Sequence, residues 1–417
     1  MAKEGGYMSF STQNLLDIRL VHGRTYTKMA KIIEGQILVE LRPNASTQNP
    51  FVPITEFRLV IDCSGSMKHA ADSDSEESKL DLVKKAILSL LSKLETQDYL
   101  CLSIFSTTGR LLVPVTCLTA SGKELVRRHV CALEPMEETT ISSGLELVLD
   151  PTIPKHLTRV VLFTDGRSSS TSIDHPRLVT LADEARKKNL PLSIYGTGAG
   201  YNWSLLQQLA IRAGGGSFCK HVMNMATLEG HLLGELAHLR GTSIDRLSVK
   251  GTSKPRVSFL RVTRMMPEMH SLNVSADSTA FEDFSGALDI YRGQQYLLEF
   301  KLTDPEIGLQ PVLDMEFHGS VCKSGNPFSQ TFGLLVAVTP KESAQPNPEI
   351  VKILTMMAAG KQAQTGQYGR ASELYRRAGD MDTARIMDRM SVAGEDEDSR
   401  RFSSTVVTGS ISKFYTR

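Results

Sequence analysis

Strand-like and helix-like segments alternate over residues 53–240, and this alternation constrains the fold more than any other feature of the sequence. Apolar runs typical of buried strands lie at residues 57–61 and 159–164. Between such runs, apolar residues recur at helical spacing, as in residues 79–94 and 175–188. Strands separated by helices of this length predict an α/β domain with a doubly wound, mostly parallel sheet.

The segments outside this domain have a different character. Residues 1–52 predict accessory N-terminal strands, and residues 241–340 predict a β-rich module, for which a sandwich completed by the N-terminal strands is one arrangement. Residues 341–392 are typical of a helical hairpin. Residues 393–417 have the composition of a disordered tail. We therefore expect a short helical region after the β-rich module.

Composition narrows the class of protein. Hydrophobic residues make up 41% of the 417 residues and charged residues 22%, as in globular proteins. Lys and Arg number 47 against 46 for Asp and Glu, so the overall charge gives no reason to expect a nucleic-acid partner. No apolar run is long enough to form a transmembrane segment, and the first ten residues lack the apolar core of a signal peptide. The six cysteines are scattered without a C-x-x-C pair, which predicts a reducing, cytoplasmic location.

An acid and two hydroxyls directly follow the first strand of the predicted sheet. Asp62, Ser64 and Ser66 occupy alternate positions around Gly65, which marks a tight turn. Open α/β sheets bind their ligands at the carboxyl ends of the strands, where this turn lies. These oxygen donors carry little charge, which suits Mg²⁺. Taken alone, the motif favours an ordinary Asp/Ser turn after a strand over a metal site.

Two further features extend the motif. Thr139 lies in a loop that leads into a helix, and Asp165 ends the strand LFTD. Together with the opening turn, they resemble the von Willebrand factor A domain and its metal-ion-dependent adhesion site. In that family, an Asp-x-Ser-x-Ser turn, a loop threonine and a second strand-end aspartate surround the ion. The resemblance implies the metal ligands Asp62, Ser64, Ser66, Thr139 and Asp165.

The loop that carries the threonine departs from the family pattern. It usually reads Gly-Gly-Thr-Asn, whereas this chain has Glu137-Glu138-Thr139-Thr140, so Thr140 remains an alternative ligand. The order of A domain, β-rich segment and helical region resembles intracellular plant and protist proteins, some of which carry a RING finger. This chain has no Cys/His cluster of RING spacing.

The resemblance implies a divalent-cation-dependent protein-binding module. The ion would be Mg²⁺, with Mn²⁺ or Ca²⁺ as alternatives, and an Asp or Glu of a protein partner would complete its coordination. The alternative is a structural scaffold or subunit of an intracellular complex, for example a ubiquitin-related one, in which the metal site is only stabilising.

We do not expect an enzyme. A phosphatase of the haloacid dehalogenase type needs a second aspartate where this chain has Ser64. The sequence contains neither a G-x-x-x-x-G-K-[ST] phosphate loop nor a G-x-S-x-G nucleophile elbow. The candidate site therefore lacks a recognisable nucleophile or base.

Overall fold

The chain forms two compact units in the computed structural model. The α/β unit comprises residues 50–241, and the β-rich unit comprises residues 1–49 together with 242–417. The structure describes residues 15–47, 52–70, 77–149, 156–165, 171–197, 202–222, 225–266, 269–275, 277–291, 293–322 and 324–393. Beyond residue 393, the predicted disordered tail lies outside these ranges.

The α/β unit is built on one sheet whose described strands run in the order β6-β5-β4-β7-β8-β9. All neighbouring strands are parallel except β6, which pairs antiparallel with β5 at one edge. The strands are β4 (Thr55–Asp62), β5 (Tyr99–Phe105), β6 (Gly109–Cys117), β7 (Leu157–Thr164), β8 (Leu192–Thr197) and β9 (Phe218–Val222). The predicted doubly wound, mostly parallel sheet is confirmed.

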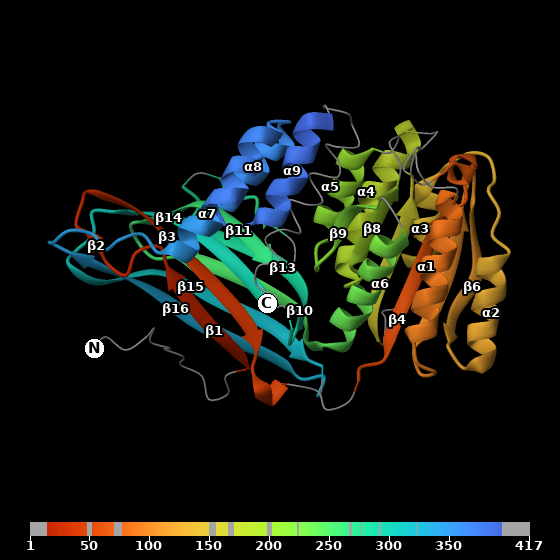
Figure 1. Cartoon of the computed structure of the whole chain (residues 1–417). Coiled ribbons are helices and arrows are strands. Elements are labelled where there is room, and N and C mark those ends of the chain that lie inside the picture. The colour runs from red at the N-terminus through yellow and green to blue at the C-terminus, as the bar shows by residue number, and fades with distance from the viewer. Residues whose placement is uncertain are drawn as a thin grey trace. The chain divides into compact units, whose positions relative to one another are not determined.

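Helices cover both faces of this sheet because alternate residues of each strand point to opposite sides (Figure 1). Phe57, Leu59 and Ile61 of β4 lie in the core beneath α1, α2 and α6, whereas Val60 lies in the core beneath α3, α4 and α5. The helices are α1 (Lys79–Lys93), α2 (Ala120–Cys131), α3 (Ile141–Leu149), α4 (Thr171–Lys187), α5 (Trp203–Ala213) and α6 (Met225–Arg240). Because helices cover both faces, every residue of β4 is buried, including its polar ones.

The β-rich unit contains two sheets, ordered β1-β3-β14-β11-β12 and β13-β10-β15-β16-β2 in the described residues. The strands of the first sheet are β1 (Leu16–His22), β3 (Ile32–Pro43), β11 (Val257–Met266), β12 (His270–Ser271) and β14 (Gln294–Thr303). Those of the second are β2 (Thr27–Lys28), β10 (Thr242–Ser253), β13 (Ala280–Asp289), β15 (Gly308–Val321) and β16 (Pro327–Thr339). The N-terminal strand β3 pairs with β14, so N-terminal strands complete the first sheet.

The first sheet is covered on both faces. Ile37, Val39 and Leu41 of β3 join residues of the second sheet in one apolar core. Leu38, on the opposite face of β3, packs in a separate core with the C-terminal helices. Because side chains alternate along β3, this strand contributes both to the core between the two sheets and to the core beneath the C-terminal helices.

The C-terminal region contains three helices in the described residues, so the predicted two-helix hairpin is wrong. They are α7 (Pro348–Gln364), α8 (Tyr368–Arg377) and α9 (Met381–Ala393). Gly366 and Gly379 have left-handed φ values of 77° and 79°, which interrupt the helix twice. Asp380 then accepts a hydrogen bond from the backbone N–H of Thr383, which favours a new helix start. None of the helices in the described ranges is long and apolar enough to cross a bilayer.

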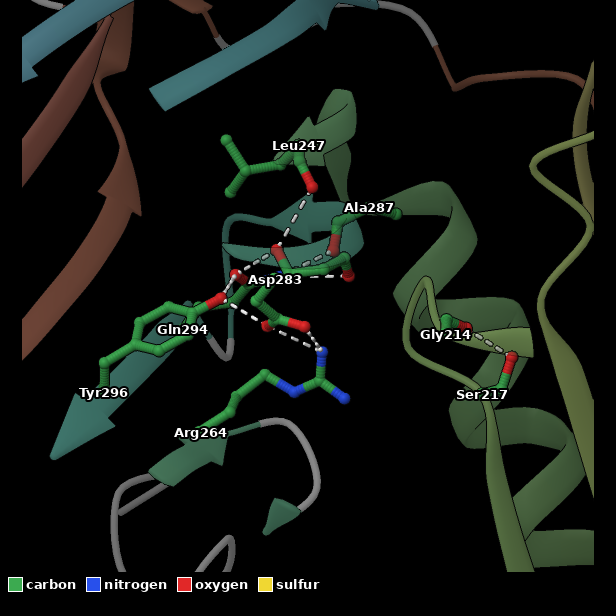
Figure 2. Close-up of polar contacts among 9 residues, drawn as sticks. Gly214, Ser217, Leu247, Arg264, Asp283, Ala287, Gln294 and Tyr296 are labelled. Atoms are coloured by element: carbon green, nitrogen blue, oxygen red, sulfur yellow. Dashed lines mark hydrogen bonds and ion pairs between the residues drawn. The ribbon is translucent and has the colours of Figure 1, made fainter. Parts of the chain in front are cut away.

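A buried polar cluster joins the two sheets of the β-rich unit. Figure 2 shows Arg264 of β11 and Tyr296 of β14 converging on Asp283 of β13. Arg264 Nη1 lies 2.9 Å from Asp283 Oδ2, and the Tyr296 hydroxyl donates to the same oxygen at 2.8 Å. Burial and the positive charge of Arg264 lower the pKa of nearby His270 to about 4. We interpret the cluster as structural because Arg264 and Tyr296 of one sheet both bond Asp283 of the other.

Candidate metal centre

The Asp-x-Ser-x-Ser turn lies at the carboxyl end of β4, as the sequence predicts. Asp62 is the last residue of the strand, and its Oδ1 accepts a 2.8 Å hydrogen bond from the backbone N–H of Ser64. A short 3₁₀ turn, Gly65–Lys68, follows and reverses the chain. The hydroxyls of Ser64 and Ser66 are 3.1 Å apart. The three side chains predicted as ligands in this turn are therefore held close together.

Gly65 brings the threonine loop against this turn. Its backbone N–H donates a 2.9 Å hydrogen bond to the carbonyl of Glu137. A Cβ at this position would lie 3.1 Å from the carbonyl oxygen of Met136, which is closer than most side chains tolerate. The absence of a side chain at Gly65 therefore permits the approach of the loop.

Of the two candidate threonines, Thr139 is buried and Thr140 is partly exposed. The backbone N–H of Thr140 donates to the carbonyl of Ser106 at 2.7 Å, which ties the loop to the end of β5. Asp174 of α4 accepts hydrogen bonds from the first backbone N–H groups of α3, at Ile141 and Ser142. The loop is thus fixed at both ends and places the Thr139 side chain in the interior.

Asp165 directly follows β7, the strand next to β4, and is fully buried. Its Oδ2 lies 2.9 Å from the ammonium of Lys79, whereas its buried Oδ1 has no hydrogen-bond partner among the described residues. Next to it, Thr164 donates a 2.7 Å hydrogen bond to Asp62 Oδ2. Burial raises the pKa of Asp62 to about 6, and the negative charge of Asp165 contributes to the rise.

These residues fit a small, hard cation. Buried oxygen atoms normally have partners, so the unsatisfied Oδ1 of Asp165 is an available ligand position. The paired hydroxyls of Ser64 and Ser66 add neutral oxygen donors, as Mg²⁺ accepts. No group of three or more His, Cys, Asp or Glu side chains able to hold a metal occurs in the described residues, so a zinc-type cluster finds no support there.

Three residues of the site were not identified from the sequence. Lys79 is buried at the first position of α1, whereas lysines of an amphipathic helix usually lie on its exposed face. Thr164 is one more residue of an apolar strand in the sequence, and Asp174 lies just before the helix expected at residues 175–188. Only Thr164 could have been identified from the sequence, by its position beside a strand-end aspartate. Lys79 and Asp174 reach the site through tertiary structure alone.

Known proteins match the α/β unit most clearly in sequence. The model of the von Willebrand factor type A domain matches residues 57–167. The probable E3 ubiquitin-protein ligase WAVH2 of Arabidopsis thaliana is 33% identical over 102 residues, which cover 24% of this chain and 14% of that protein. The human von Willebrand factor A domain-containing protein 5A is 23% identical over 336 residues, which cover 80% of this chain and 38% of that protein. The chain thus spans well under half the length of these relatives.

Solved structures resemble the fold over nearly the whole chain. A von Willebrand factor type A protein from Catenulispora acidiphila has a TM-score of 0.77 at 14% identity, covering 96% of this chain and 99% of that one. The ArnB paralog VWA2 from Sulfolobus acidocaldarius has a TM-score of 0.55 at 12% identity, covering 95% and 99%. At these identities, the likeness concerns the fold. The α/β unit thus has a von Willebrand factor A-type fold, accompanied by strand-rich regions, and its residues 57–167 match the model of that domain.

Proposed function

We propose that this protein is a divalent-cation-dependent protein-binding module. Asp62, Ser64, Ser66, Thr139 and Asp165 would hold Mg²⁺, or Mn²⁺ or Ca²⁺ in its place, and an Asp or Glu of a partner protein would complete the coordination. The observation that carries the proposal is the buried Oδ1 of Asp165, which has no hydrogen-bond partner among the described residues and lies at the sheet edge that carries the paired serine hydroxyls. A bound cation would supply the missing interaction.

The residues of the site favour binding over catalysis. Both carboxylates are fully buried and engaged by Thr164 or Lys79, so neither is placed as an exposed base. The hydroxyls of Ser64 and Ser66 lie 3.1 Å apart and pair with each other, not with a base. A hydroxyl without a neighbouring base is a weak nucleophile. We therefore propose that the protein is not an enzyme.

A cation-dependent capture experiment tests the proposal. Wild type, Asp62→Ala and Asp183→Ala would first be titrated with MgCl₂ by calorimetry. Asp183 is a matched control because it forms a partly exposed ion pair with Arg212 in the same unit. Immobilised proteins would then capture partners in MgCl₂ or EDTA, and each identified partner would be tested again with its acidic residue changed to Asn or Gln.

We expect Asp62→Ala and EDTA to abolish Mg²⁺ binding and capture, with Asp183→Ala unaffected. Capture that persists with a folded Asp62→Ala variant would contradict the metal bridge. That result would favour the alternative, a scaffold or subunit whose metal site is only stabilising. The relative named as a probable E3 ubiquitin-protein ligase makes a ubiquitin-related complex one setting for such a scaffold.

A cytoplasmic location is part of the proposal. All six cysteines lie in the described part of the chain and have free thiols, which fits a reducing compartment. Microscopy of a tagged chain, with fractionation as a second measure, would test it. Enrichment outside the cytoplasm would contradict this part without affecting the metal site.

A further inference from the structure

Lys79 occupies an unusual position for a lysine. Its side chain is 8% exposed, against 53% for Lys85 on the same helix. It is also the first residue of α1, and the backbone N–H groups at a helix start disfavour a nearby cation. Neither solvation nor the helix itself therefore explains a lysine at this point.

The local structure fixes Lys79 in place. Ser78 caps α1 by accepting a hydrogen bond from the backbone N–H of Asp81. The backbone N–H of Lys79 donates a 2.9 Å hydrogen bond to the carbonyl of His69, just beyond the metal-site turn. The ammonium then lies 2.9 Å from Asp165 Oδ2. A buried ammonium needs such a partner, since an unpaired buried charge is strongly unfavourable.

The contact between Lys79 and Asp165 changes the net charge of the site. Asp62 and Asp165 supply two negative charges when ionised, and Lys79 returns one positive charge. A divalent ion bound to the two carboxylates alone would give a neutral site. With Lys79 present, the filled site keeps one positive charge, which a partner's carboxylate can neutralise.

We propose that Lys79 is a tethered cation that stabilises the metal-free site, weakens divalent-cation binding and leaves the filled site positively charged. This inference rests on the proposed function, because it assumes that the site holds a divalent ion. Lys79 acts through Asp165 and would not be a metal ligand itself. Its ammonium repels the incoming ion, whereas without that ion it neutralises a buried carboxylate.

Four variants of the full-length chain separate charge from structure. Lys79→Met removes the charge, and Lys79→Gln removes it but keeps a hydrogen-bond donor for Asp165. Lys79→Arg keeps the charge. Lys93→Met is the matched control, since Lys93 is exposed near the end of the same helix. For each variant and for wild type, we would measure the melting temperature in EDTA and in MgCl₂, and the affinities for Mg²⁺, Mn²⁺ and Ca²⁺ by calorimetry.

We expect Lys79→Met and Lys79→Gln to bind Mg²⁺ at least tenfold more tightly than wild type. Both should melt several degrees lower in EDTA, and MgCl₂ should restore most of that loss. Lys79→Arg and Lys93→Met should stay within twofold of the wild-type affinity. If Lys79→Met fails to fold, Lys79→Gln supplies the same comparison.

The outcomes distinguish this inference from the proposed function. Unchanged or weaker Mg²⁺ affinity in a folded Lys79→Gln variant would overturn the role of Lys79 while leaving the metal site intact. A melting deficit that MgCl₂ does not reduce would also overturn it, because it would indicate packing alone. A wild-type chain that binds none of Mg²⁺, Mn²⁺ and Ca²⁺ would overturn the proposed function and this inference with it.

Discussion

The hydroxyl of Thr164 donates a 2.7 Å hydrogen bond to Oδ2 of Asp62, and thereby joins the ends of the two central strands β7 and β4. Asp62 receives a second hydrogen bond on its other carboxylate oxygen, from the backbone N–H of Ser64. The carboxylate is fully buried, so both bonds offset the cost of removing its charge from water. The orientation of the first residue of the metal site thus depends on a residue of the neighbouring strand.

Thr164→Val should destabilise the α/β unit by about 1 to 3 kcal/mol, because a buried carboxylate oxygen loses its donor while the side-chain shape is kept. Mg²⁺ affinity should fall as well. The one tryptophan of the chain, Trp203, lies in this unit, so urea unfolding followed by its fluorescence reports the change. Thr180→Val is the control, since that exposed hydroxyl bonds within α4, and an equal loss there would refute the role of Thr164.

The metal-free α/β unit should become less stable as the pH rises from about 4 to 7. Burial raises the pKa of Asp62 from 3.8 to about 6, so the protonated form is favoured by folding. The contribution is fully present below pH 3.8 and is lost as the pH rises through about 6. This rise in the pKa of Asp62 corresponds to about 3 kcal/mol of the free energy of unfolding.

Unfolding in EDTA at several pH values would measure this contribution, with Asp62→Asn as the comparison. Asp62→Asn should remove the dependence, because the amide does not titrate in this range. MgCl₂ should oppose the loss in wild type by stabilising the ionised carboxylate. A wild-type profile that parallels Asp62→Asn in EDTA would show that Asp62 does not titrate as expected.

Gly65→Ala should weaken Mg²⁺ binding by at least tenfold while the unit stays folded. The new Cβ would lie 3.1 Å from the carbonyl oxygen of Met136, so the loop that carries Thr139 must move away. Calorimetric titration gives the affinity and circular dichroism checks the fold. Gly230→Ala is the control, because its Cβ would meet no atom within 4 Å, and it should leave the affinity unchanged.

The β-rich unit should lose stability in acid through His270. Burial and the positive charge of Arg264 lower its pKa from 6.5 to about 4, although Asp283 partly opposes the shift. Stability from the neutral imidazole is therefore fully present above pH 6.5 and is lost as the pH falls towards 4. The loss should be about 2 to 3 kcal/mol.

Hydrogen exchange measured by mass spectrometry would follow β11 and β14 between pH 7 and pH 4, after correction for the intrinsic rates. His270→Gln should flatten the dependence for these strands. Equal acid sensitivity in wild type and His270→Gln would assign the loss to other groups.

The sequence predicts those parts of the site that follow directly from strand ends. Asp62 and Asp165 each end a buried strand, and the parallel sheet brings such ends to one edge. The serines follow at once along the same turn. The fold of residues 53–240 is also predictable from the sequence. The spacing of apolar residues and the lengths of the helices depend on residues that are close together in the chain.

Other features depend on contacts between distant residues. Lys79 is indistinguishable by helical spacing from the exposed lysines of α1, and its partner Asp165 lies 86 residues away. Asp174 caps a different helix from the one it belongs to. The third C-terminal helix does not follow from the sequence, because helical spacing continues past Gly379, whose left-handed backbone ends α8.

The pairing of β3 with β14 has a consequence for synthesis of the protein. Pro43, at the end of β3, and Gln294, at the start of β14, are separated by the whole α/β unit. At the usual ribosomal rate of about 5 to 20 residues per second, β3 has no partner on that side for roughly 12 to 50 seconds. Until β14 emerges, the apolar edge of β3 is open to wrong pairing, while residues 50–241 emerge and can fold. The nascent chain should therefore be most dependent on chaperones between completion of the α/β unit and emergence of β14.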